Sequence, residues 1–190
     1  NFEMAQEMAE MEGIEVASVV VDDDIAVEDS LYTQGRRGVA GTILVHKILG
    51  DAARAGKSLS EIKALADELV KNIHTVGLAL SGATVPEVGK PGFVLADDEI
   101  EFGIGIHGEP GYRKEKMQPS KDLAKELVEK LSQSLELKSG KKIGLLINGM
   151  GATPLMEQYV FAADVANLLT EAGVEVVYKK LGNYMTSIDM

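Results

Sequence analysis

Cysteine is absent from the 190-residue chain, and histidine occurs only three times. Without cysteine there is neither a disulfide framework nor a thiolate metal site. This suits a reducing compartment, and we expect a cytoplasmic protein. The sequence has no run of about 18 apolar residues, which a membrane-spanning helix would need. No basic-then-apolar segment of the signal-peptide kind opens it either.

Basic residues are also scarce, since 19 lysines and arginines stand against 30 aspartates and glutamates, giving a net charge of −11. Nucleic-acid binding depends on lysine and arginine that neutralise phosphates, and the best local cluster is only Arg36-Arg37. The composition therefore argues against nucleic acid as a direct partner and favours a small neutral ligand or a cationic protein surface. No Gly-Lys-Ser/Thr phosphate loop is present, so ATP binding by that route is not expected.

The hydrophobic pattern predicts an α/β protein in two parts, and the 45% hydrophobic content is ample for a packed core. Residues 1–75 are interpreted as the C-terminal part of a first, open-sheet α/β domain, followed by bridging helices. A continuous β-branched run at 16–21 predicts a strand buried on both faces. Helices are expected at 39–49 and from Ser58 to about Thr75, and Ser58-Leu59-Ser60-Glu61 has the form of a capping box.

Beyond residue 75 the pattern changes to a second α/β domain, residues 76–190. Short strands at 76–80, 92–96 and 101–107, separated by glycine and proline turns, predict antiparallel pairing. An amphipathic helix at 121–135 and strands at 143–147 and 174–178 complete a mixed or antiparallel sheet flanked by helices. Thr153 is expected to be the N-cap of one more helix, with Pro154 in its first turn.

Two charged clusters leave alternatives open. Asp22-Asp23-Asp24 follows the predicted strand at 16–21, where ligands bind in open α/β sheets. A solvated turn is the simpler interpretation, because a metal site would need further ligands. Arg36-Arg37 lies between glycines and could bind phosphate. A carboxylate held across an interface is the favoured alternative.

The segment 102–111, Phe-Gly-Ile-Gly-Ile-His-Gly-Glu-Pro-Gly, is the most informative for chemistry. If it is a strand, the apolar side chains point to the core, and Gly103, Gly105 and His107 share a bare opposite face. The pattern alone leaves open whether His107 binds a ligand or is structural. Glu109, in the turn that follows, either orients His107 or is only a polar turn residue. His46 and His74 lie in predicted helices and are interpreted as structural.

Gly149-Met150-Gly151 lies between a predicted strand and a predicted helix. Such glycines can admit a dinucleotide pyrophosphate, but Pro154 occupies the place of the third glycine. A structural turn is therefore favoured.

The motifs together resemble one family. The sequence Gly-Ile-Gly-Ile-His-Gly-Glu-Pro-Gly at 103–111 is similar to the active-site histidine signature of dihydroxyacetone kinases. Six further segments resemble that family in the same order, namely 19–27, 29–33, 35–40, 90–93, 151–155 and 186–190. The chain is thus similar to the substrate-binding subunit of these kinases, from one end to the other.

The resemblance implies that a ring nitrogen of His107 adds to the ketone carbon of dihydroxyacetone and forms a hemiaminal. His107 is then a covalent anchor, and it selects ketones over glycerol, which has no electrophilic carbon. The implied substrate-binding set is His107, Gly103, Gly105, Gly108 and Glu109, with no metal. The family's base, usually an Asp, and its assisting Lys and His are expected to precede Asn1, so we expect an N-terminally truncated chain.

The resemblance also implies partners. ADP or ATP with Mg²⁺ is expected on a separate helical subunit or domain, recharged by a phosphotransferase-system protein, and no cofactor is expected on this chain. Apart from the resemblance, the predicted antiparallel edge strands and the acidic surface favour a homodimer. Two alternatives remain: a non-catalytic dihydroxyacetone-binding paralogue that acts as a transcriptional coactivator, and the first part of a single-chain ATP-dependent kinase.

Overall fold

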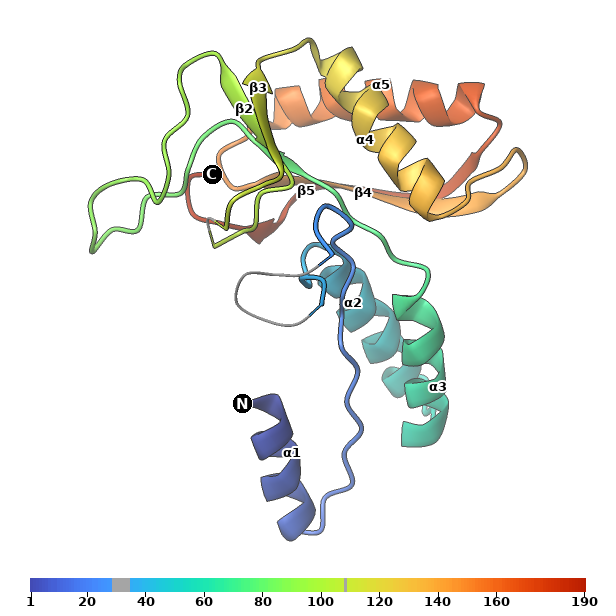
Figure 1. Cartoon of the computed structure of the whole chain (residues 1–190). Coiled ribbons are helices and arrows are strands. Elements are labelled where there is room, and N and C mark those ends of the chain that lie inside the picture. Colours follow the sequence, from blue (N-terminus) through green and yellow to red (C-terminus); the bar gives the residue numbers. More distant parts are fainter. Residues whose placement is uncertain (29–34, 108) are drawn as a thin grey trace.

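The computed structural model describes residues 1–28, 35–107 and 109–190 (Figure 1). Segment 29–33, quoted above for the family resemblance, and Gly108 lie outside these residues. The described helices and strands are, in order, α1 (Phe2–Met11), α2 (Gly41–Arg54), α3 (Leu59–Val70), β1 (Leu78–Ala79), β2 (Glu99–Phe102), β3 (Arg113–Lys116), α4 (Ser120–Ser134), β4 (Lys142–Met150), α5 (Leu155–Glu171) and β5 (Glu175–Thr186). The chain is therefore a mixed α/β protein. Among the described helices, none is long and apolar enough to cross a membrane.

The capping box predicted at Ser58 is present. The Ser58 hydroxyl accepts a hydrogen bond from the Glu61 amide at 3.3 Å, and the Glu61 carboxylate accepts from the Ser58 amide at 2.9 Å. The helix ends at Val70 rather than near Thr75. The Asn72 side chain bonds the Glu68 carbonyl at 2.9 Å, and Thr75 is drawn to Asp23, whose carbonyl accepts from its amide at 2.7 Å. Beyond Val70, hydrogen bonds of the Asn72 side chain and of the distant residue Asp23 therefore take the place of further helical hydrogen bonds.

The prediction of a strand at 16–21 is wrong. These residues run as an extended segment between α1 and α2 (Figure 1), and in the described part of the chain no strand pairs with them. Val20 is 78% exposed, and α1 buries none of its residues. The nearest sheet-like contact is a single parallel bridge between Asp24 and Thr75. A β-branched run favours extended backbone, but a strand also needs a neighbour with which to exchange hydrogen bonds.

The antiparallel pairing predicted beyond residue 75 is confirmed. β2 lies between β1 and β3, and Phe102 stands opposite Leu78 on one side and Arg113 on the other. Ile100 and Phe102 are fully buried, and they form a core cluster with Leu123 and Leu127 of α4. No strand forms at 92–96, and β2 stops at Phe102, well before residue 107.

The remaining strands form a separate parallel pair rather than one mixed sheet with β1–β3. β4 and β5 pair in parallel and are connected by α5. α4 and α5 pack side by side over them (Figure 1). The helix predicted to be capped by Thr153 begins at Leu155, with Pro154 at the N-cap position and no side-chain capping bond. The extended ψ of 145° at Pro154 delays the start of the helix by one residue.

Replacing Ser58 by Ala removes the cap acceptor and is expected to lower stability by about 1 kcal/mol. For a chain of this size the loss corresponds to a fall in melting temperature of roughly 2–4 °C. Thermal unfolding followed by circular dichroism measures it. Ser58→Asp, which keeps a cap acceptor, should melt close to the parent protein. Equal melting of the alanine variant and the parent would show that the cap does not support α3.

Candidate functional site

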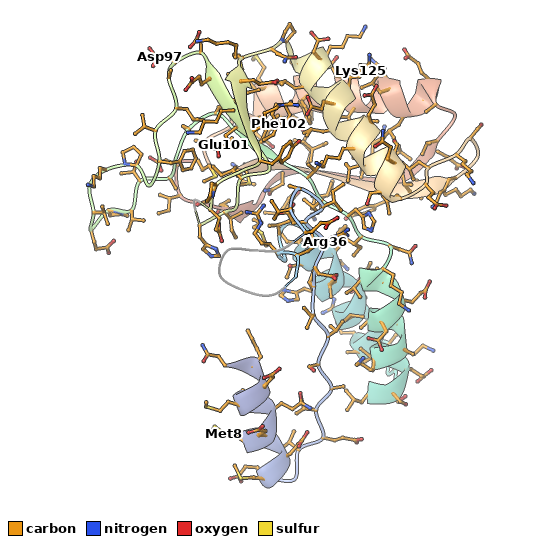
Figure 2. The ribbon with its side chains drawn as sticks, viewed as in Figure 1. Met8, Arg36, Asp97, Glu101, Phe102 and Lys125 are labelled. Carbon is orange, nitrogen blue, oxygen red and sulfur yellow. The ribbon has the colours of Figure 1, made fainter. Side chains whose placement is uncertain are left out.

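The candidate site is the loop that follows β2, residues 103–107 and 109–111, here called the His107 loop. Glu101 and Phe102 lie at the end of β2, where the loop begins (Figure 2). Gly103 adopts a φ of +73°, a conformation outside the β region, and this ends the strand. The premise that 101–107 is one strand is therefore wrong. Ile104 is nevertheless buried, as expected, because it packs against Ala79 and Met190.

His107 and Glu109 form a local pair. The His107 ring Nδ1 lies 3.2 Å from Glu109 Oε1, and the His107 amide donates to Glu109 Oε2 at 3.0 Å. The Glu109 side chain is largely buried, whereas that of His107 is 79% exposed. Glu109 was expected either to orient His107 or to be only a polar turn residue. This geometry favours the first interpretation, because the Glu109 carboxylate contacts the imidazole.

The surroundings of Glu109 favour its ionised form. Burial tends to raise the pKa of Glu109, but hydrogen bonds from its own backbone and from His107 outweigh burial and hold the pKa below its usual range. Ionised Glu109 can only accept hydrogen bonds, so the proton in the ring contact belongs to Nδ1. In the neutral tautomer that keeps this Nδ1 proton, the lone pair lies on Nε2. No hydrogen bond to Nε2 is found among the described residues.

The sequence pattern predicts that Gly103 and Gly105 leave a bare face beside His107. This prediction is wrong. A Cβ at Gly105 would overlap the Glu109 carboxylate and approach Arg37 Nη1 to 2.7 Å. At Gly103 it would lie 2.6 Å from the Tyr112 ring and 2.7 Å from Ala26 Cβ. The glycines instead allow the loop to pack closely against neighbouring groups.

Arg37 connects this loop to the segment before α2. It is buried, its Nε donates to Asp24 Oδ2 at 2.8 Å, and its Nη2 donates to the Gly103 carbonyl at 2.7 Å. The sequence left open whether the arginine pair binds phosphate or a carboxylate. Arg37 binds a carboxylate, that of Asp24. Its neighbour Arg36 lies close to the start of α2 (Figure 2).

The solvated-turn interpretation of the aspartates is wrong for Asp23 and Asp24, which are both buried, and holds only for Asp22. Asp23 accepts from the Val39 amide at 2.7 Å, from the Gly41 amide at 2.8 Å and from the Thr75 hydroxyl. Burial raises the pKa of Asp24, and its bonds to the Ala26 amide and Arg37 counter this only in part. Both carboxylates are internal acceptors, and in the described part of the chain no cluster of three metal-ligating groups occurs.

Of the other sequence candidates, His74 and Gly149 contact protein groups, and His46 lies on the surface. His74 Nδ1 is 2.7 Å from the Ser134 hydroxyl, and burial together with nearby Arg36 lowers the pKa of His74. His46 is exposed on α2. A Cβ at Gly149 would overlap the side chains of Gln158 and Asn183, so close packing of protein side chains accounts for this glycine.

Sequence reasoning missed Ser187. Its hydroxyl donates to the Ile106 carbonyl, directly before His107, and its amide donates to the Met150 carbonyl at 2.7 Å. In the sequence, the segment 186–190 stands out only as a family-like motif. Because 81 positions separate Ser187 from Ile106, no local pattern indicates the contact.

Comparison with known proteins defines the class to which this α/β chain belongs. A model of the Dak1 domain family matches residues 1–190. The chain is 70% identical over 190 residues to the PTS-dependent dihydroxyacetone kinase, dihydroxyacetone-binding subunit DhaK of Lactococcus lactis, covering 100% of this chain and 57% of that protein. The chain belongs to the Dak1 family, which confirms the resemblance drawn from its motifs.

Two solved structures agree with this assignment. The dihydroxyacetone kinase operon co-activator Dha-DhaQ superposes with a TM-score of 0.92 at 49% identity, over 100% of this chain and 58% of that one. The native dihydroxyacetone kinase of C. freundii superposes with a TM-score of 0.86 at 30% identity, over 100% of this chain and 34% of that one. The chain thus spans little more than half the length of the L. lactis subunit or the co-activator.

Replacing Gly105 by Ala is expected to separate Glu109 from His107, since the new methyl group would occupy the position of the Glu109 carboxylate. The ¹⁵N resonances of the His107 ring, recorded in histidine-labelled protein, should shift toward those of a Glu109→Gln variant. Gly77→Ala is the matched control, because a Cβ at Gly77 meets open space. Unchanged ring resonances in Gly105→Ala would contradict the close packing of Gly105, Glu109 and Arg37.

Proposed function

We propose that this protein binds dihydroxyacetone covalently through His107 and presents it for phosphorylation to dihydroxyacetone phosphate. One observation carries the proposal: His107 Nδ1 contacts Glu109 while the ring is exposed, an arrangement in which Nε2 would be the nucleophilic atom. The 70% identity to a dihydroxyacetone-binding subunit supports the choice of ligand. The implied substrate-binding set is His107, Gly103, Gly105, Gly108 and Glu109, with Gly108 outside the described residues.

The adduct forms by nucleophilic addition followed by proton transfer. The Nε2 lone pair adds to the ketone carbon while the carbonyl π bond breaks, and the oxygen becomes an alkoxide that takes up a proton. The ring, now substituted on Nε2, releases its Nδ1 proton and is neutral again. Glu109 is placed to receive that proton at 3.2 Å. The product is a hemiaminal, and no oxidant or cofactor is consumed.

Covalent attachment gives both selectivity and position. A polyol such as glycerol offers similar hydroxyls but has no carbon for Nε2 to attack. The attached substrate holds its terminal hydroxyl at a defined place for phosphoryl transfer. We propose that ADP or ATP with Mg²⁺ is carried by a partner subunit and recharged through the phosphotransferase system. A homodimer of two-domain subunits, with the boundary near residue 75, is part of the same proposal.

A second candidate function rests on the solved co-activator, which superposes with a TM-score of 0.92 at 49% identity. A non-catalytic dihydroxyacetone-binding coactivator could share the same His107 loop. Phosphate transfer with the cognate nucleotide-carrying subunit separates the two. A folded complex that binds dihydroxyacetone but transfers no phosphate would favour the coactivator.

His107→Ala is expected to abolish adduct formation, because no ring nitrogen remains to attack the ketone. Native mass spectrometry of full-length protein incubated with dihydroxyacetone, without borohydride, measures the mass increase. In [2-¹³C]dihydroxyacetone the labelled carbon should also change from ketone to tetrahedral. His46→Ala, on exposed α2, should form the adduct normally. An adduct that persists on His107→Ala would sink the assignment.

The His107–Glu109 pair should also give a pH-dependent contribution to stability. Because the folded-state pKa of Glu109 is lowered, its ionised form stabilises the folded protein above the unfolded-state pKa. That stabilisation is lost as pH falls through the lowered folded-state pKa. Urea melts of the parent and Glu109→Gln should therefore differ at pH 7, and the difference should shrink as the pH falls below the usual range of glutamate pKa values. A gap that stays constant across this range would contradict an ionised Glu109 in the folded state.

A further inference from the structure

We propose that Arg37 and Ser187 are positioning residues that hold the backbone of the His107 loop from outside and so set the direction of the His107 ring. The inference rests on the proposed function, because it concerns the same nucleophile. Neither residue contacts the ring. Each acts on a carbonyl of the loop, Arg37 on that of Gly103 and Ser187 on that of Ile106.

The need for such residues follows from the pair itself. The His107 side chain is 79% exposed, and its partner Glu109 lies only two residues further along the same loop. The loop also closes on itself, since the Gly105 amide donates to the Glu109 carbonyl at 3.0 Å. These internal bonds keep the imidazole and carboxylate together, but they do not fix the pair relative to the rest of the protein.

Arg37 supplies the first external contact. Its planar guanidinium bonds Asp24 through Nε and the Gly103 carbonyl through Nη2, so Asp24 fixes the plane from which Nη2 reaches the loop. The Arg37 carbonyl in turn accepts from the Asp24 amide at 3.0 Å. A further bond, from the Gly103 amide to the Gly77 carbonyl at 2.7 Å, holds the same residue from the side of β1. The start of the loop is therefore held by the buried Arg37–Asp24 pair and by the Gly77 carbonyl.

Ser187 supplies the second contact, at the end next to the nucleophile. Its hydroxyl donates to the Ile106 carbonyl, so it acts on the peptide unit that joins Ile106 to His107. Ser187 is itself held by its amide bond to the Met150 carbonyl. Three residues on, Met190 is buried against Ile104, and this contact places the same segment beneath the loop. The loop from 103 to 107 is thus held at both ends.

The test uses three variants of the full-length protein and two matched controls. Arg37→Lys keeps a cation for Asp24 but loses the planar fork. Ser187→Ala loses the hydroxyl, and Ser187→Thr restores one. Arg54→Lys and Ser132→Ala are matched controls on α2 and α4. The adduct with [2-¹³C]dihydroxyacetone is titrated by ¹³C NMR, and folding is followed by circular dichroism.

Arg37→Lys and Ser187→Ala are each expected to weaken the adduct about threefold to tenfold, the range for losing one hydrogen bond. Ser187→Thr should recover most of the affinity, and the controls should match the parent. In folded variants, adduct affinities within twofold of the parent would overturn the inference, even with a lowered melting temperature. If Arg37→Lys does not fold, the Ser187 variants alone decide.

The inference and the proposed function fail differently. If the parent protein forms no adduct, the proposed function falls, and the orientation of the ring is judged without substrate from the ¹⁵N resonances of His107. A ring signal that moves in Ser187→Ala and returns in Ser187→Thr supports positioning. An unmoved signal in Ser187→Ala overturns it. If the parent forms the adduct and the variants match it, the inference alone falls.

Discussion

The buried ion pair of Arg37 and Asp24 is the interaction on which the candidate site depends. Taking two charges out of water is costly, and such a pair adds little net stability unless its remaining donors and acceptors are also used. Here they are used, because Arg37 donates to the Gly103 carbonyl and Asp24 accepts from the Ala26 amide at 2.8 Å. The pair therefore joins the segment before α2 to the loop that carries His107.

The neighbouring Asp23 extends this junction in the other direction. Its carboxylate receives the amides at the start of α2 and the hydroxyl of Thr75, beyond the end of α3. A Cβ at Gly41 would lie 2.6 Å from Asp23 Oδ2, so this approach too requires a glycine. Asp23 and Asp24 thus connect their own segment to the start of α2, to Thr75 and, through Arg37, to the His107 loop. In a chain of net charge −11, some of the negative charge consequently serves as internal hydrogen-bond acceptors.

What could be predicted from the sequence was governed by local rules. The capping box at Ser58 and helix α4 follow from spacing alone, and His107 with Glu109 could be chosen as a candidate pair because they are two residues apart. The strand at 16–21 failed because strands require partners that propensity does not supply. The contacts of Arg37 with Gly103 and of Ser187 with Ile106 span 66 and 81 positions, so only the folded chain reveals them.

The exposure of His107 and the burial of the groups around its loop are two sides of one requirement. Under the proposed function, covalent chemistry provides selectivity, so the nucleophile need not lie in an enclosed pocket. Under the same proposal, the attached substrate must present its terminal hydroxyl to a phosphoryl donor on another subunit, and an error of about 1 Å in such a position can lower a rate about a hundredfold. An exposed side chain has few contacts of its own to hold it. Its direction must then come from the backbone, and the backbone is fixed from its buried side.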